Sequence, residues 1–118
     1  MRKAYDNRSA DRLVPLLRNI HKELRERSDA VRRLENRVRN LSEQELDSTV
    51  FYNLQAELAT HHRETRLAKK ELARLGCALD ESHPYRVLIP GVNGELEPGF
   101  AWALGDTRVQ ATPGEEAS

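Results

Sequence analysis

Apolar side chains recur at every third or fourth position through the first third of the chain. This spacing places them on one side of an α-helix and predicts a helix over about residues 7–40. Pro15 falls within the first turns, where a missing backbone N–H costs least. One step of the pattern, at Arg27 and Ser28, is polar. The apolar stripe consists of Leu13, Leu17, Ile20, Leu24, Val31, Leu34, Val38 and Leu41.

A second stripe with the same spacing follows a short polar segment. Ser42 and Glu45 have the spacing of a capping box, which marks a helix start, and Gly76 is the expected left-handed terminator. Together they predict a second helix over about residues 43–75. Its apolar members are Phe51, Leu54, Leu58, Ala68, Leu72 and Leu75.

The polar interruptions of the two stripes coincide when the helices fold against each other. A short connection between long helices makes them antiparallel neighbours, and aligning the stripes pairs residues whose numbers add to about 88. Arg27 and Ser28 then lie opposite His61, where His61 and Thr65 replace apolar residues. Because an unsatisfied buried imidazole costs about 1–3 kcal/mol, a polar neighbour is favourable. We predict that Arg27, Ser28, His61 and Thr65 form a polar layer that fixes the register of a coiled coil.

The period of the pattern changes after residue 76. Residues 86–89 and 100–104 read as strands with an Asn-Gly turn signal between them, and a third short strand is expected near residues 107–110. So small a sheet is not stable alone, so it should lie on the base of the hairpin, with Trp102 as its anchor.

These elements predict an α+β fold in one domain, residues 1–111. A long antiparallel two-helix coiled-coil hairpin is followed by a small antiparallel β-sheet at its base. The sheet should occupy about residues 77–110, and residues 112–118 have the composition of a flexible tail.

Three consecutive residues near the hairpin turn carry more apolar surface than a two-helix seam buries. These are Val50, Phe51 and Tyr52. Exposed apolar surface of this kind is typical of an interface, so we predict a homodimer in which two hairpins join as a four-helix bundle.

The net charge of zero hides an uneven distribution. Residues 1–41 hold 12 basic and 6 acidic side chains, whereas residues 76–118 hold 2 and 7. Such segments neutralise each other within the fold or between two copies. A nucleic acid bound to the basic first helix is the alternative. Against it, the arginines are interleaved with acids and only 5% of residues are aromatic, which leaves few side chains for stacking on bases.

Few residues offer catalytic or metal-binding chemistry. His61 and His62 are adjacent, and adjacent helical residues point about 100° apart, so we expect no metal or other cofactor there. Cys77 and His83 could act as nucleophile and base, which is a second alternative function, although the sequence supplies no evident oxyanion hole.

The predicted hairpin tip is acidic, with Glu43, Glu45 and Asp47. An acidic tip on a helical hairpin resembles transcription-cleavage factors that reach into RNA polymerase. That likeness rests on shape alone, and we favour the explanation that these carboxylates are favourable charges at a helix N-terminus.

The compartment follows from two absences in the sequence. Cys77 is the single cysteine, so the chain forms no internal disulfide, and it contains no run of about 18 apolar residues. We expect a cytoplasmic protein without a membrane partner.

Three short motifs resemble one known family. They are Tyr5-Asp6 with Ala10, Asp11 and the run from Leu13 to Arg18; Leu75 to Asp80; and Trp102 to Asp106. These residues resemble the small bacterial proteins grouped as domain of unknown function 2203, over residues 5 to about 110. The resemblance implies a shared fold and no assigned activity. The sequence therefore favours a non-enzymatic, homodimeric interaction or scaffold module that binds a protein partner.

Overall fold

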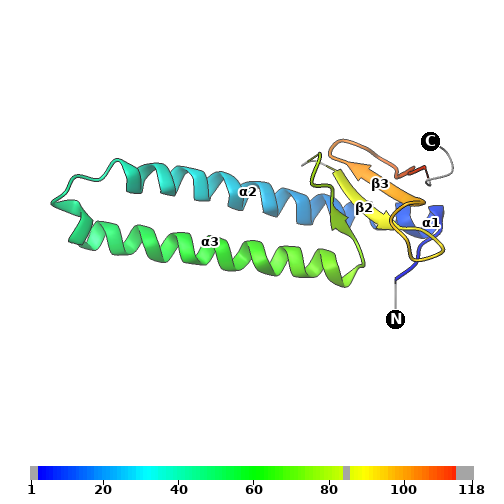
Figure 1. The fold of residues 1–118 in the computed structure, drawn as a ribbon, viewed down its shortest axis with the longest axis horizontal. Helices are drawn as coiled ribbons and strands as arrows, with labels where there is room; N and C mark the ends of the chain where they lie inside the picture. Colours follow the sequence, from blue (N-terminus) through cyan, green and yellow to red (C-terminus); the bar gives the residue numbers. More distant parts are fainter. Residues whose placement is uncertain (1–2, 84–85, 114–118) are drawn as a thin grey trace. The chain divides into compact units, whose positions relative to one another are not determined.

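The fold class is the one predicted from the sequence. The computed structural model describes residues 3–83 and 86–113. Two long helices, α2 (Val14–Arg39) and α3 (Thr49–Arg74), run antiparallel side by side (Figure 1). In the described part of the chain, four short antiparallel strands follow them in the sequence. The strands are β1 (Ala78–Leu79), β2 (Arg86–Pro90), β3 (Gly99–Ala103) and β4 (Gln110–Ala111).

The first predicted helix is two helices. A short helix α1 (Asn7–Asp11) precedes α2, and Arg12 and Leu13 form a turn between them. The prediction of one helix over residues 7–40 is therefore wrong at this point. Pro15 explains the break, because its nitrogen cannot donate to the carbonyl of Asp11 and its ring crowds that carbonyl.

The second helix begins later than predicted. The Glu45 Oε1 atom accepts hydrogen bonds from the Ser42 N–H at 3.1 Å and the Ser42 hydroxyl at 3.0 Å. This contact supports a single 3-10 turn, η1 (Glu45–Asp47), after which Ser48 is extended and α3 starts at Thr49. The predicted start at residue 43 is wrong because the cap serves this turn and not the long helix.

The end of α3 is as predicted. Gly76 has φ +79°, the left-handed conformation that glycine adopts most readily. The Gly76 N–H donates to the Ala73 carbonyl at 2.9 Å, and the Cys77 N–H donates to the Leu72 carbonyl at 3.2 Å. These two bonds form a Schellman motif, which satisfies the last helical carbonyls.

Contacts divide the chain into two compact units. The hairpin unit is Lys22–Lys69, and the base unit combines Met1–His21 with Lys70–Ser118. Both long helices pass through both units, and the single domain expected from the sequence stays a prediction.

The base unit is organised around the sheet. Its strand order is β1-β2-β3-β4, with Val87 opposite Trp102 and Leu88 opposite Ala101. Trp102 is fully buried, as predicted for the anchor, and its Nε1–H donates to the Asp106 carbonyl at 2.9 Å. The ring of buried His21 meets the Trp102 ring edge-on, with centroids 5.9 Å apart. Strand β1 was not predicted, because two residues are too short to show an alternating pattern.

The last strand, β4, is shifted by one residue from the end of the predicted strand at residues 107–110, and ordered contacts reach one residue into the predicted tail. Thr112 is buried, its N–H donates to the Gly99 carbonyl at 2.9 Å, and its hydroxyl accepts from the Gly99 N–H at 2.7 Å. A tail that begins at residue 112 is therefore wrong for this residue. The remaining part of that prediction, residues 114–118, lies outside the described residues.

The hairpin unit has an aliphatic core. Leu34, Leu54 and Leu58 are buried together, with Val31, Val38 and Leu41 packed against them. All six belong to the apolar stripes read from the sequence. The stripes therefore form the seam between α2 and α3, as predicted.

Candidate functional site

A direct contact joins the two polar interruptions of the hairpin seam. Nη1 of Arg27 lies 3.1 Å from Nδ1 of His61. A guanidinium only donates hydrogen bonds, so Nδ1 must be the acceptor and a neutral His61 carries its proton on Nε2. The imidazole is thereby oriented by α2.

The other predicted members of the polar layer, Thr65 and Ser28, do not contact the opposite helix in the way that Arg27 and His61 do, and Glu23 adds a contact to Arg27. The Thr65 hydroxyl donates to the His61 carbonyl at 2.8 Å, a bond within α3. Glu23, one turn before Arg27, accepts from Nη2 of Arg27 at 3.5 Å. Ser28 is exposed, so its predicted place in the layer is wrong. Since adjacent helical residues point about 100° apart, Arg27 and Ser28 cannot both face His61.

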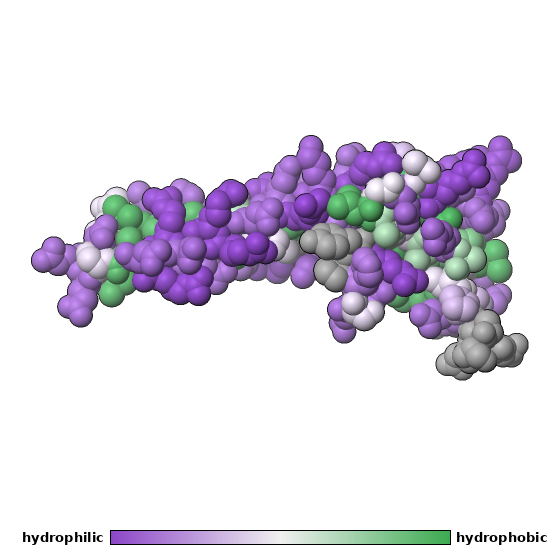
Figure 2. All heavy atoms as spheres, turned by 90° about the horizontal axis from the view of Figure 1, so that it is seen from above, coloured by the Kyte–Doolittle hydropathy of each residue, from purple (hydrophilic) through white to green (hydrophobic). Residues whose placement is uncertain are grey.

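The predicted interface residues present apolar surface near the hairpin turn. The exposed fraction is 62% for Tyr52 and 42% for Val50, whereas Phe51 is half-buried and its ring meets the Tyr52 ring edge-on with centroids 5.6 Å apart. Figure 2 shows apolar residues gathered at the turn end of the hairpin, with polar residues over most of its remaining length.

A groove of about 500 Å³ runs along one side of the hairpin unit. Val38 and Leu58, which belong to the core, form part of its lining. The other lining residues are the charged Glu35 and Arg39 of α2 and the exposed Gln55, Ala59 and His62 of α3. None of the sites predicted from the sequence includes this groove. The signal was a second, uncharged stripe on α3 at Gln55, Ala59 and His62, which share one helix face beside the leucine seam.

Comparison with known proteins identifies a family. The family model described as "Uncharacterized conserved protein (DUF2203)" matches residues 3–117. The chain belongs to this family. The resemblance seen in the sequence motifs is thereby confirmed. No curated protein and no solved structure matches the chain.

Cys77 and His83 of this DUF2203 protein are in contrasting environments. Cys77 is buried, and burial raises the pKa of its thiol to about 12. The thiol therefore stays protonated near neutral pH, which is the unreactive form. His83 is exposed in the turn before β2, where its N–H donates to the Asp80 carbonyl at 3.1 Å. The structure gives no support to a nucleophile and base pair here.

The two adjacent histidines of α3 in this DUF2203 chain have different surroundings. Nδ1 of His61 faces the Arg27 guanidinium, and His62 lines the groove. Within residues 3–83 and 86–113, no group of three or more His, Cys, Asp or Glu side chains is placed to hold a metal ion. In the same part of the chain, no helix is long and apolar enough to cross a membrane.

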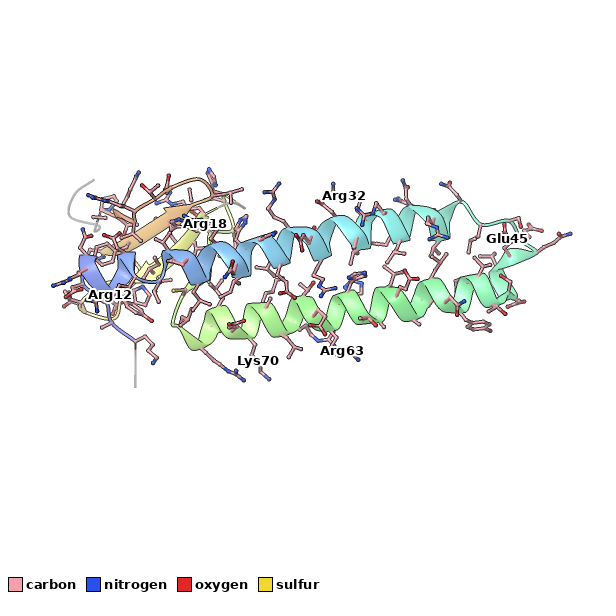
Figure 3. All side chains as sticks on the ribbon, turned by 180° about the vertical axis from the view of Figure 1, so that it is seen from behind. Arg12, Arg18, Arg32, Glu45, Arg63 and Lys70 are labelled. Carbon is pink, nitrogen blue, oxygen red and sulfur yellow. The ribbon has the colours of Figure 1, made fainter. Side chains whose placement is uncertain are left out.

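Several charged side chains of the hairpin have local partners. Hydrogen bonds from the Ser42 N–H and hydroxyl lower the pKa of Glu45. On α2, Lys22 pairs with Glu26 at 4.0 Å and Arg32 with Asp29 at 3.8 Å. Figure 3 shows Arg32 and Arg63 pointing away from the seam. Exposed pairs of this kind contribute about 0–1 kcal/mol and are typical of a solvated helix surface.

Proposed function

We propose that this DUF2203 protein is a non-enzymatic interaction or scaffold module that acts as a homodimer through its hairpin unit. The proposal rests on one observation: exposed apolar surface at Tyr52, near the hairpin turn, lies beside the groove. Tyr52 is 62% exposed, and Gln55, one turn further along α3, lines the groove. The dimer would present a paired helical surface to a protein partner.

Burial of this surface gives a driving force for association. Apolar area removed from water contributes about 25 cal/mol per Å². One two-helix seam buries one stripe of each helix, which leaves Tyr52 exposed. Two hairpins packed as a four-helix bundle cover a second stripe on each helix.

The candidate catalytic groups of the chain have structural surroundings that support a non-enzymatic role. His61 is held by Arg27, and the Cys77 thiol is buried. Glu45 is engaged by Ser42 at the start of the 3-10 turn. Each group therefore has a role in the fold that accounts for its position.

A charge placed on the exposed apolar surface tests the proposal. Tyr52→Lys should convert the dimer to a monomer by light scattering, because dimerisation would then bury an ammonium group. Leu67→Lys is the matched control, since Leu67 is 52% exposed on the same helix and does not line the groove. Monomeric wild-type protein, or equal masses for both variants, would remove this surface from the proposal.

A further inference from the structure

We propose that the groove of the hairpin unit is filled by α3 of a second copy of this chain, running antiparallel, so that the two α3 helices cross at Leu58 and Ala59. This rests on the proposed homodimer and specifies its geometry. The paired stripes of α3, the small residue at their centre and the distribution of charge along the hairpin support the arrangement.

The groove side of α3 is self-complementary about the point between Leu58 and Ala59. Gln55 lies three residues before Leu58, and His62 lies three residues after Ala59. A two-fold axis at the midpoint therefore sets Gln55 of one copy against His62 of the other, twice in each dimer. The Gln55 amide both donates and accepts, so it can pair with either nitrogen of His62.

The side chain at the centre permits close packing. Helix axes approach to about 8–10 Å, and the side chains at the crossing point set the distance within this range. Ala59 is exposed on the groove and has only a methyl group, so the second helix can approach Leu58 and the floor residue Val38. A second helix in the groove would therefore bury the apolar surface that Leu58 and Val38 leave exposed there.

Charge distinguishes the antiparallel from the parallel arrangement. Residues 35–47 at the turn end hold four acidic and two basic side chains, a net charge of 2 − 4 = −2, even though Arg39 lines the groove, whereas residues 60–69 hold three basic and one acidic side chain, a net charge of 3 − 1 = +2. Antiparallel pairing about the midpoint brings the acidic turn of one copy within about a helical turn of Lys69 in the other. Parallel pairing would set the two acidic turns beside each other, where like charges repel.

The aromatic residues follow the same symmetry. Pairing about the Leu58–Ala59 midpoint sets Phe51 and Tyr52 of one copy near Arg66 of the other. A guanidinium over an aromatic ring contributes about 0.5–1 kcal/mol at an exposed site. This contact would cover Tyr52, whereas Val50, about 200° away around the helix, would lie outside the interface.

Cysteine cross-linking tests the geometry separately from dimerisation. A disulfide requires Cα atoms about 4.4–6.8 Å apart, which the crossing point allows for residue 59 of the two copies. Under mild oxidation Ala59→Cys should form a covalent dimer at least tenfold faster than Ala56→Cys. The control replaces an exposed alanine of the same helix that does not line the groove. Wild-type protein, with its buried Cys77, gives the background.

Light scattering on the same samples separates the two proposals. A dimeric mass with fast cross-linking at position 59 supports both. A dimeric mass without preferential cross-linking at position 59, or with faster linking of Leu46→Cys in the turn, overturns the antiparallel geometry and leaves the homodimer standing. A monomeric mass for wild-type protein overturns both.

Discussion

Arg27 and His61 contact each other across the seam of the hairpin, with Nη1 3.1 Å from Nδ1. Each residue occupies the point at which its helix interrupts an otherwise apolar stripe. The contact therefore matches one register, in which Leu34, Leu54 and Leu58 pack together further towards the turn. A polar pair in a helical seam fixes register more effectively than it adds stability.

Replacement of His61 by leucine tests whether the pair contributes specificity or stability. The Arg27 side chain is 30% exposed and has Glu23 at 3.5 Å, so it keeps solvent and one partner when the imidazole is removed. We expect the free energy of unfolding of His61→Leu to stay unchanged or to rise by about 1 kcal/mol. His61→Ala, which leaves the seam underfilled, should be the less stable variant. Urea denaturation measures both, and a loss of folding in His61→Leu would show that the imidazole is required.

Replacement of Gly76 tests the end of α3. In Gly76→Ala the new Cβ atom would lie 2.8 Å from the Lys3 Cβ atom, and the alanine would have to keep a φ of +79°. Gly105→Ala is the matched control, because Gly105 has a φ of +98° but a Cβ atom there would have no atom within 4 Å. The left-handed conformation costs about 1–2 kcal/mol for alanine, so both variants should lose this amount. Gly76→Ala should lose more, and equal thermal shifts for the two would show that the contact with Lys3 adds no cost.

The thiol of Cys77 should react slowly in the folded protein. Burial raises the pKa of its thiol to about 12, compared with about 8.5 for an unfolded cysteine. Folding therefore favours the neutral thiol. The stabilisation is present below the unfolded value and is lost as the pH rises through the folded pKa. Labelling with a thiol reagent at pH 7 should be at least a hundredfold slower than in urea. Rapid labelling of native protein would instead restore Cys77 as a candidate nucleophile.

The cap of α1 gives a pH-dependent prediction. Hydrogen bonds from the Ser9 N–H, and then from the Ser9 hydroxyl, lower the pKa of Asp6. The carboxylate therefore stabilises the fold above its unfolded pKa of about 3.9, and this contribution is lost as the pH falls through the lower folded value. Asp6→Asn keeps a capping oxygen without the charge. The melting temperature of wild-type protein should exceed that of Asp6→Asn at pH 7, and the difference should shrink as the pH falls below the unfolded pKa of about 3.9. A difference that is constant with pH would contradict this.

The sequence predicts the parts of the fold that depend on a repeated pattern. The two stripes and the strands β2 and β3 each have such a pattern, and the structure confirms them. The end of α3 could also be predicted, because a single glycine at residue 76 marks it. The helix starts were less accurate, because Pro15 and the Ser42–Glu45 contact act through local geometry that stripe spacing does not contain. Ser28 was misplaced because a register gives the level of a residue along the seam without its direction around the helix.

The groove was missed for a different reason. It depends on residues beside the seam, where Gln55, Ala59 and His62 are exposed and show no apolar periodicity. Sequence patterns identify what a helix buries within one chain. They are less informative about a face that a second copy would cover.

The mass of the wild-type protein in solution tests the central claim most directly. Light scattering over a range of concentrations should give twice the chain mass of 13.5 kDa, because two hairpin units bury the apolar surface near Tyr52. A mass of 13.5 kDa at every concentration would contradict the account.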